Sequence, residues 1–174
     1  KRISLWRKSN PKNILHYKNG IAFNISKNKT SVSKSLVFQS NYEFNETNLV
    51  KKVIKPDWTV IDVGANFGWY SIHFSKLVGQ SGSVFSFEPI PETYSELNSN
   101  IKLNSCQNVK AFNLALGNKD GTISFSVPNF DGGSGASSEF LQYSKRIQTT
   151  MRHLDDVIKE QKINKVDFIK ADTW

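Results

Sequence analysis

The 174-residue sequence has little sulfur and no long apolar run. It contains a single cysteine, Cys106, so a disulfide within the chain is excluded. We interpret Cys106 as a small buried hydrophobic residue, because no histidine lies near it in sequence to activate it as a nucleophile. A lone thiol is typical of a reducing compartment, which favours a cytoplasmic protein. No stretch approaches the roughly 18 consecutive apolar residues that a membrane-spanning helix needs, and no signal peptide is recognisable.

Two common nucleotide-binding motifs are also missing. The stretch Val60–Ser71 reads Val-Ile-Asp-Val-Gly-Ala-Asn-Phe-Gly-Trp-Tyr-Ser, which predicts a strand, a tight turn and a helix. A dinucleotide fingerprint requires Gly-x-Gly-x-x-Gly, but Asn66 stands where the second glycine should be. A phosphate-binding loop would require Gly-Lys-Ser/Thr. The spacing disfavours both, and it suits S-adenosylmethionine better, because that cofactor carries ribose and adenine but no phosphate.

From Trp58 onward, strand-like and helix-like segments alternate. The expected strands span 59–63, 83–87, 109–113 and 166–171, and the expected helices span 67–78, 91–103 and 154–161. This alternation predicts an α/β fold with a Rossmann-like, doubly wound and mostly parallel sheet that binds ligands at the carboxyl ends of its strands. Segments 121–127 and 146–150 have the pattern of an antiparallel β insertion. Between them, the glycine-rich stretch 131–138 is interpreted equally well as a lid or as a solvent loop.

Residues 1–56 are predicted to form a basic, β-rich N-terminal extension to a ligand-binding domain at 57–174. The first segment has 12 Lys/Arg and 2 Asp/Glu, and the second has 11 and 13, so their net charges are +10 and −2. We expect a hairpin around Lys18-Asn19-Gly20, with a modest contribution to the core, and a short helix at 46–54. Nucleic acid or another polyanion is a candidate partner, but only charge supports it, and a solvated basic face is the better interpretation.

Glycines and polar residues gather where three expected strands end, and they make the candidate cofactor site. Backbone amides of the turn and the positive end of the following helix could hold a polar ligand group. Glu88 ends the second strand without an evident structural partner, and it could accept hydrogen bonds from both hydroxyls of a ribose. The stretch 113–117 would lie along a flat base. The predicted cofactor-binding residues are Asp62, Gly64, Ala65, Asn66, Gly68, Glu88, Pro89, Leu114 and Ala115.

From about Tyr42 to Asp172 the sequence resembles the FkbM-type S-adenosylmethionine-dependent methyltransferases. The resemblance rests on blocks at 60–70, 87–91, 100–104, 108–109, 115–117, 154–157 and 166–172, among which the Gly-Ala-Asn turn and Phe-Glu-Pro are the most specific. It implies a class I, Rossmann-like fold, S-adenosylmethionine as cofactor and methyl transfer to a hydroxyl, typically of sugars, glycolipid-like molecules or secondary metabolites. The family usually has Thr where His153 stands, and Asp-x-Glu-Gly-x-Glu where this chain has Asp172-Thr173-Trp174.

The fold class implied by this resemblance has a seven-stranded sheet, whereas this sequence ends after the fourth sheet strand. We expect the fourth strand to lie beside the first and to leave an edge that is open to pairing. The chain is therefore expected to be a fragment, or to have this edge covered by another chain, for example in a homo-oligomer.

Methyl transfer requires that the acceptor oxygen is aligned and loses its proton. Asp172, at a strand end, and His153 are the candidate bases, although hydrogen bonding for Asp172 and an ordinary half-exposed position for His153 are the commoner roles. We expect His73 to lie on the surface, and Trp69 and Tyr70 to pack under the sheet. No metal site is predicted.

Two functions are compatible with the sequence. The first is an S-adenosylmethionine-dependent O-methyltransferase that acts on a hydroxyl of a sugar, a glycan or a small metabolite. The alternative is a non-catalytic or truncated module with a cofactor-binding fold, which binds an anionic partner through its basic N-terminal segment.

Overall fold

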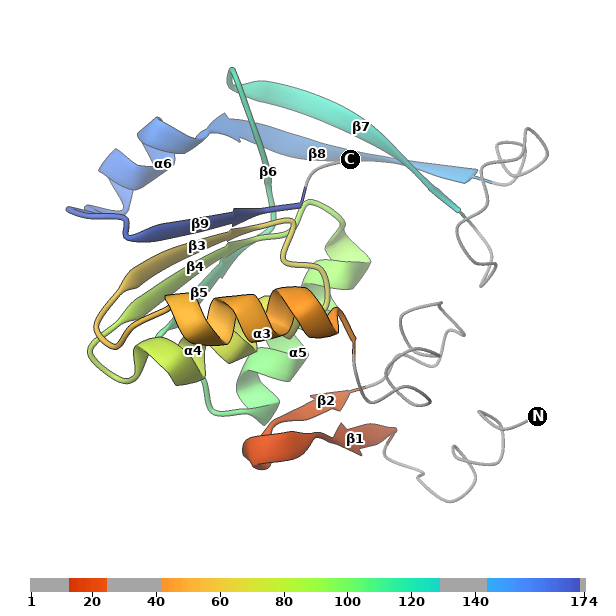
Figure 1. The fold of residues 1–174 in the computed structure, drawn as a ribbon. Coiled ribbons are helices and arrows are strands. Elements are labelled where there is room, and N and C mark those ends of the chain that lie inside the picture. Colours follow the sequence, from red (N-terminus) through yellow and green to blue (C-terminus); the bar gives the residue numbers. More distant parts are fainter. Residues whose placement is uncertain (1–12, 25–41, 129–143, 173–174) are drawn as a thin grey trace.

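The computed structural model describes residues 13–24, 42–128 and 144–172. Its centre is a parallel sheet with the strand order β5-β4-β3-β9 (Figure 1). The strands are β3 (Thr59–Val63), β4 (Ser83–Phe87), β5 (Val109–Phe112) and β9 (Phe168–Ala171). The predicted Rossmann-like sheet is confirmed, and the fourth strand lies beside the first as expected.

Helices cover both faces of this sheet. On one face lie α3 (Phe44–Val53), α4 (Trp69–Val78) and α5 (Pro91–Leu103), and α6 (Leu154–Glu160) lies on the other (Figure 1). Helix α4 begins two residues later than predicted, because its N-cap, Gly68, has a left-handed φ of 97°. Within the described ranges, none of the helices is both long and apolar enough to cross a membrane.

A second sheet lies on the α6 side of the molecule (Figure 1). It contains β6 (Ala115–Gly117), β7 (Gly121–Pro128) and β8 (Ser144–His153) in the order β6-β8-β7. Strands β7 and β8 are antiparallel, as predicted, but β6 was missed, because three residues are too few to show a periodic pattern. The glycine-rich stretch 131–138 lies outside the described residues.

The N-terminal hairpin belongs to the core, so the prediction that it contributes little is wrong. Strands β1 (Ile14–His16) and β2 (Ala22–Asn24) pair antiparallel. Phe23 is 0% exposed and stacks on Trp69 with 5.0 Å between the ring centroids. Asn104, which follows α5, accepts the N–H of Ala22 and donates to its carbonyl. The hairpin is thus held against both α4 and α5.

His73 is buried, which corrects the prediction that it lies on the surface. Its Nδ1 is 2.8 Å from the carbonyl oxygen of Trp69, and its ring packs against Tyr17 and Trp69. Burial lowers the pKa of its imidazole. The sequence pattern predicts that one face of α4 is covered. In the structure, the N-terminal elements cover a second face of this helix. Trp69, Tyr70 and Cys106 are buried, as predicted.

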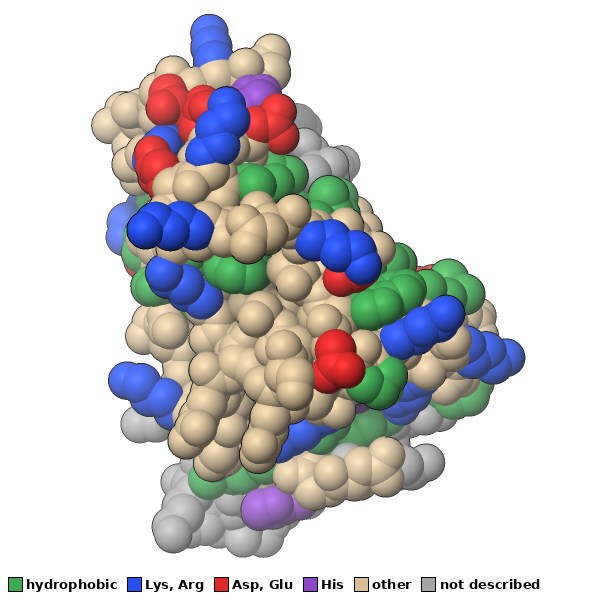
Figure 2. Space-filling view, turned by 90° about the vertical axis from the view of Figure 1, so that its left-hand side faces the viewer, with side chains coloured by type: hydrophobic (Ala, Val, Ile, Leu, Met, Phe, Trp, Pro, Cys, Tyr) green, Lys and Arg blue, Asp and Glu red, His purple; other side chains and the backbone are tan. Residues whose placement is uncertain are grey.

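The surface carries charges of both signs over α6 and the β6–β7 turn (Figure 2). On α3, Lys51 and Lys52 are exposed beside Leu49 and Val53, whose exposed fractions are 61% and 36%. This helix supplies part of the basic charge of residues 1–56. A polyanionic partner for that segment stays a prediction.

Candidate functional site

The turn between β3 and α4 is fixed by its neighbours at the carboxyl ends of the strands. The amides of Gly64 and Ala65 both donate to the carbonyl of Phe87, at 3.0 and 2.9 Å. Gly64 has a φ of 70°, and a Cβ on it would lie 2.2 Å from the carbonyl oxygen of Asp172. Only glycine therefore permits this close approach between the turn and the end of β9.

Glu88 ends β4 and holds the turn through its side chain. The residue is 5% exposed; Oε2 accepts the N–H of Asn66 at 2.8 Å, and Oε1 accepts the N–H of Ile90 at 2.9 Å. Burial raises the pKa of Glu88, and the two N–H bonds oppose this rise. The view that Glu88 has no structural partner is wrong. Each oxygen can nevertheless accept a second hydrogen bond, so the carboxylate keeps capacity for two hydroxyl groups.

Asp62 lies beneath the turn, on the sheet face covered by α4. It is 0% exposed, and its Oδ2 accepts a hydrogen bond from Ser71 at 2.7 Å, while Ser71 accepts one from Ser86 at 2.8 Å. Its Oδ1 has no hydrogen-bond partner and lies 3.7 Å from Nζ of Lys170. Burial raises the pKa of Asp62 to about 6, and Lys170 limits the rise. Asp62 therefore supports the turn from below.

Asp172 and Lys170 bring the end of β9 to the same place. The N–H of Asp172 donates to the carbonyl of Val63 at 3.0 Å, and its side chain is 70% exposed. Lys170 Nζ lies 3.6 Å from Oδ2 of Asp172 and 3.5 Å from the carbonyl oxygen of Gly64. Lys170 was not predicted as a site residue. The available signal was a lysine inside an apolar strand, at a position that the structure pairs with Asp62.

The end of β5 reaches the site through Asn113. Its Nδ2 donates to the carbonyls of Glu88 and Pro89, at 2.9 and 3.1 Å. Leu114 packs into the core that contains Ile61, Phe87 and Val157, and the following Ala115 begins β6 and is buried. The third strand end is thereby tied to the second. Contact of Leu114 or Ala115 with a base stays a prediction.

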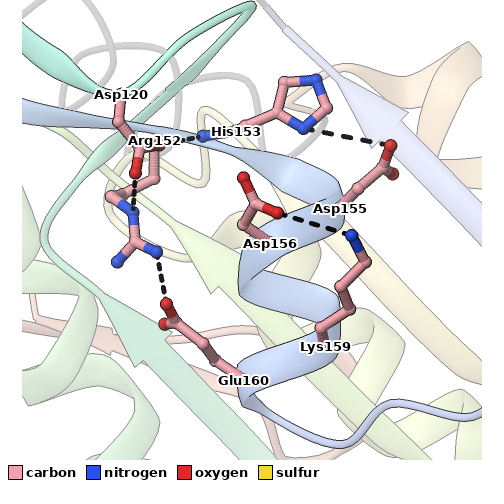
Figure 3. A network of polar contacts seen from close by, with 7 residues as sticks. All are labelled: Asp120, Arg152, His153, Asp155, Asp156, Lys159 and Glu160. Carbon is pink, nitrogen blue, oxygen red and sulfur yellow. Dashed lines mark hydrogen bonds and ion pairs between the residues drawn. The ribbon is translucent and has the colours of Figure 1, made fainter.

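His153 lies in a different environment, at the junction of β8 and α6 (Figure 3). Its backbone N–H donates to Asp120 at 2.9 Å, and its Nδ1 is 3.9 Å from Oδ2 of Asp155. The side chain is 41% exposed, and its polar contact in the described part of the chain is with Asp155. Asp155 lies in the first turn of α6. Among the described residues, no polar contact joins His153 to the strand-end residues. The geometry therefore does not support His153 as a base.

The structure thus brings most of the predicted residues together at one edge of the sheet. The turn offers backbone amides and carbonyls, Glu88 offers a carboxylate, and Lys170 with Asp172 offers charges of both signs. This donor and acceptor set suits a nucleoside that carries a charged amino-acid end, and so it fits S-adenosylmethionine. Among the described residues, no group of three or more His, Cys, Asp or Glu side chains could hold a metal ion.

Known proteins were compared with the chain in sequence and in structure. Methyltransferase 1 of Beauveria bassiana (strain ARSEF 2860) is 24% identical over 135 residues, which are 67% of this chain and 54% of that protein. The chain therefore spans about half the length of this curated relative. A SAM-dependent methyltransferase from Aquifex aeolicus is 28% identical to this chain, with a TM-score of 0.36. The match covers 38% of this chain and 37% of that protein. M. jannaschii TYW2 in complex with AdoMet is 27% identical and covers 57% and 41%, with a TM-score of 0.43.

The methyltransferase FkbM domain matches residues 62–173. The match begins at the buried aspartate under the turn, passes through Glu88 and reaches the end of β9 with Asp172. It includes more than half of the 174 residues. By this match and by the fold that carries it, the chain belongs to the FkbM methyltransferase family.

Proposed function

We propose that the chain acts as an S-adenosylmethionine-dependent O-methyltransferase on a hydroxyl of a sugar, a glycan or a small metabolite. One observation carries the proposal: the buried carboxylate of Glu88 lies 2.8 Å from the Asn66 amide of the glycine turn, within the segment that matches the family. This distance supports a role for Glu88 as the acceptor of ribose hydroxyls, next to the amides that would meet the rest of a nucleoside ligand.

Each part of the cofactor has candidate residues in this chain. Glu88 would accept the ribose hydroxyls, and the turn 64–68 would surround the centre of the ligand. Leu114 and Ala115, at the neighbouring strand end, would lie nearest to the adenine. Asp172 and the carbonyl of Gly64 would accept hydrogen bonds from the ammonium of the amino-acid end. When bound, the cofactor supplies a methyl group on a positively charged sulfur.

Asp172 is the better candidate for deprotonation of the acceptor hydroxyl, which one of its carboxylate oxygens would meet while the other accepts from the ligand ammonium. Its carboxylate is 70% exposed and follows β9 directly beside the turn, so a hydroxyl from solvent can reach it. A base must come within hydrogen-bond distance of the proton that it removes. His153, with its contacts to Asp120 and Asp155, has no comparable position. The remaining requirement is alignment of the acceptor oxygen with the methyl carbon, which binding in one orientation supplies.

Titration of this chain with S-adenosylhomocysteine, followed by calorimetry, tests the proposal. We expect saturable binding, and at about 100 times the dissociation constant the ligand should stabilise the fold by about 2.7 kcal/mol. NAD is the matched negative control, because Asn66 replaces the second glycine of its fingerprint. Absence of any shift with S-adenosylhomocysteine would contradict the proposal. It would favour the alternative, a non-catalytic or truncated module that binds an anionic partner through its basic N-terminal segment.

A further inference from the structure

Lys170 is a charged residue on a covered face of the central sheet. It lies on β9 opposite Asp62 of β3, and its side chain is 17% exposed. Its Nζ is 5.0 Å from the centroid of the Tyr70 ring on α4. A lysine is seldom buried to this extent unless its charge is paired. The position therefore requires partners for the ammonium group.

Three acceptors surround this ammonium group, and they come from three parts of the chain. Nζ is 3.5 Å from the Gly64 carbonyl, 3.6 Å from Oδ2 of Asp172 and 3.7 Å from Oδ1 of Asp62. These distances exceed the 2.7–3.2 Å that is usual for an N–H···O hydrogen bond. Lys170 is consequently held between its partners without a short bond to any of them.

The partner beneath Lys170 is also incompletely bonded. Asp62 is 0% exposed, and its Oδ1 has no hydrogen-bond partner. A buried polar atom of this kind normally has a partner, and an exception at a ligand site calls for a functional explanation. Lys170, which is 17% exposed, therefore keeps donors available next to the turn, and the buried Asp62 beneath it does not take them up. A simple structural ion pair would be expected to close to hydrogen-bond distance.

We propose that Lys170 is a specificity-determining residue, which together with Asp172 and the Gly64 carbonyl selects ligands that end in a charged amino-acid group. This inference rests on the proposed function. The ammonium of Lys170 can donate to a ligand carboxylate, and the exposed carboxylate of Asp172 and the Gly64 carbonyl can receive a ligand ammonium. A ligand end with both charges satisfies all of these groups. A ligand with an uncharged end would form no charge-assisted hydrogen bonds with these groups.

Two ligands that differ only in this end provide the test. S-adenosylhomocysteine has the amino-acid group, whereas 5′-methylthioadenosine has the same adenosine and a thioether without it. For Lys170→Met we expect calorimetry to show about tenfold weaker binding of S-adenosylhomocysteine, because a charge-assisted hydrogen bond is lost. Binding of 5′-methylthioadenosine should change less than about twofold, and Lys170→Arg should retain a large part of the preference.

Lys110→Met is the matched control. Lys110 also holds its ammonium near an aromatic ring, 5.6 Å from the centroid of Phe112, but on β5 and without a contact to the turn. The control should leave the affinity for both ligands unchanged. If Lys170→Met does not fold, Asp172→Asn replaces it, because that side chain is 70% exposed, and the same selective loss is expected.

The outcomes separate this inference from the proposed function. Equal losses for the two ligands would show that Lys170 only supports the fold, and unchanged affinities would show that it does not meet the ligand end; either result overturns the inference alone. If the unmodified chain binds neither ligand, the proposed function fails as well.

Discussion

At the scale of single residues, the site combines buried carboxylates with incomplete hydrogen bonding. Asp62 is the clearest case, because burial raises its pKa to about 6 from an ordinary value of 3.8. Holding it charged at neutral pH costs folding free energy. The neighbouring Lys170 and Ser71 stabilise the charged carboxylate and offset part of this free-energy cost.

We expect Asp62 to make the free energy of unfolding fall as pH rises from about 4 to about 6. In this window the folded chain binds a proton that the unfolded chain has released, so a rise in pH favours unfolding. One pKa unit corresponds to about 1.4 kcal/mol, which puts the whole effect at about 1–3 kcal/mol. Urea unfolding of the unmodified chain and Asp62→Asn between pH 4 and 8 measures it.

The stability difference between these two proteins should change across that window and become constant above about pH 7. Asp155→Asn is the control for the substitution itself, because its side chain is 71% exposed. A difference between the unmodified chain and Asp62→Asn that stays constant from pH 4 to 8 would contradict the assignment.

Glu88→Ala is expected to weaken binding of S-adenosylhomocysteine by about 1.5–3 kcal/mol for each charge-assisted hydrogen bond that is lost. It should also destabilise the fold by about 1–3 kcal/mol, because the partly buried amides of Asn66 and Ile90 lose their acceptor. Calorimetry gives the first quantity and urea unfolding the second. Glu92→Ala is the control, since this glutamate is 65% exposed and pairs with the exposed Lys145. Unchanged affinity of Glu88→Ala would remove Glu88 from the site.

The residues at strand ends could be predicted because a parallel sheet brings its carboxyl ends to one edge, whatever the side chains are. Lys170 could not, because its place depends on the register between β3 and β9, which are more than 100 residues apart. The hydrogen bonds of Glu88 were hidden for a related reason. Its partners are backbone amides, and one of them belongs to Asn66, whose left-handed conformation with a φ of 52° no local pattern reports.

At the scale of elements, an ion network joins the β6–β7 turn to α6 (Figure 3). Asp120 accepts hydrogen bonds from Nε of Arg152 at 3.1 Å and from the backbone N–H of His153 at 2.9 Å. Arg152 also contacts Glu160 at the end of α6, and Lys159 pairs with Asp156 at 3.6 Å. Asp120 thus holds the end of β8 where α6 begins.

Asp120→Ala is expected to destabilise the fold more than Lys159→Ala does, because it removes an acceptor from a backbone amide and from Arg152. Lys159→Ala breaks only an exposed pair and should cost less than about 0.5 kcal/mol. Urea unfolding at low and high salt compares the two. Affinity for S-adenosylhomocysteine should stay unchanged in both variants. A loss of affinity in Asp120→Ala would show that this region is coupled to the site.

Elements with a strong periodic pattern could be predicted to the residue. The bounds of β3, β4 and α5 agree with the expected ranges 59–63, 83–87 and 91–103. The start of α4 could not be predicted to the residue. The left-handed conformation of Gly68 makes the helix begin two residues after the start of the apolar pattern. Strand β6 depends wholly on its pairing with β8, which no local pattern reports.

At the scale of the whole molecule, the N-terminal segment and the methyltransferase domain share one core. Phe23 of the hairpin and Val50 of α3 belong to the same buried cluster as Val60, Trp69 and Phe74. Trp69 also donates its indole N–H to Thr47 of α3 at 2.9 Å. Sequence patterns place segments along the chain, but they do not show which segments fold over one another.

Phe23→Ala is expected to lower the free energy of unfolding by about 3–5 kcal/mol, because the ring is fully buried and a cavity would remain against Trp69. Trp69 fluorescence and urea unfolding measure the effect. Phe44→Ala is the control, since Phe44 is 54% exposed and its loss should cost less than about 0.5 kcal/mol. Equal stability of the two variants would show that the hairpin does not belong to the core.

The shared core also sets the time at which the protein can fold during its synthesis. Ala22 pairs with a side chain 82 residues later, and Thr59 pairs with one 108 residues later. At about 5–20 residues per second, the hairpin waits about 4–16 s for Asn104 to leave the ribosome. Until then the surface that buries Phe23 is incomplete. This core is therefore completed only after residue 167 has been made.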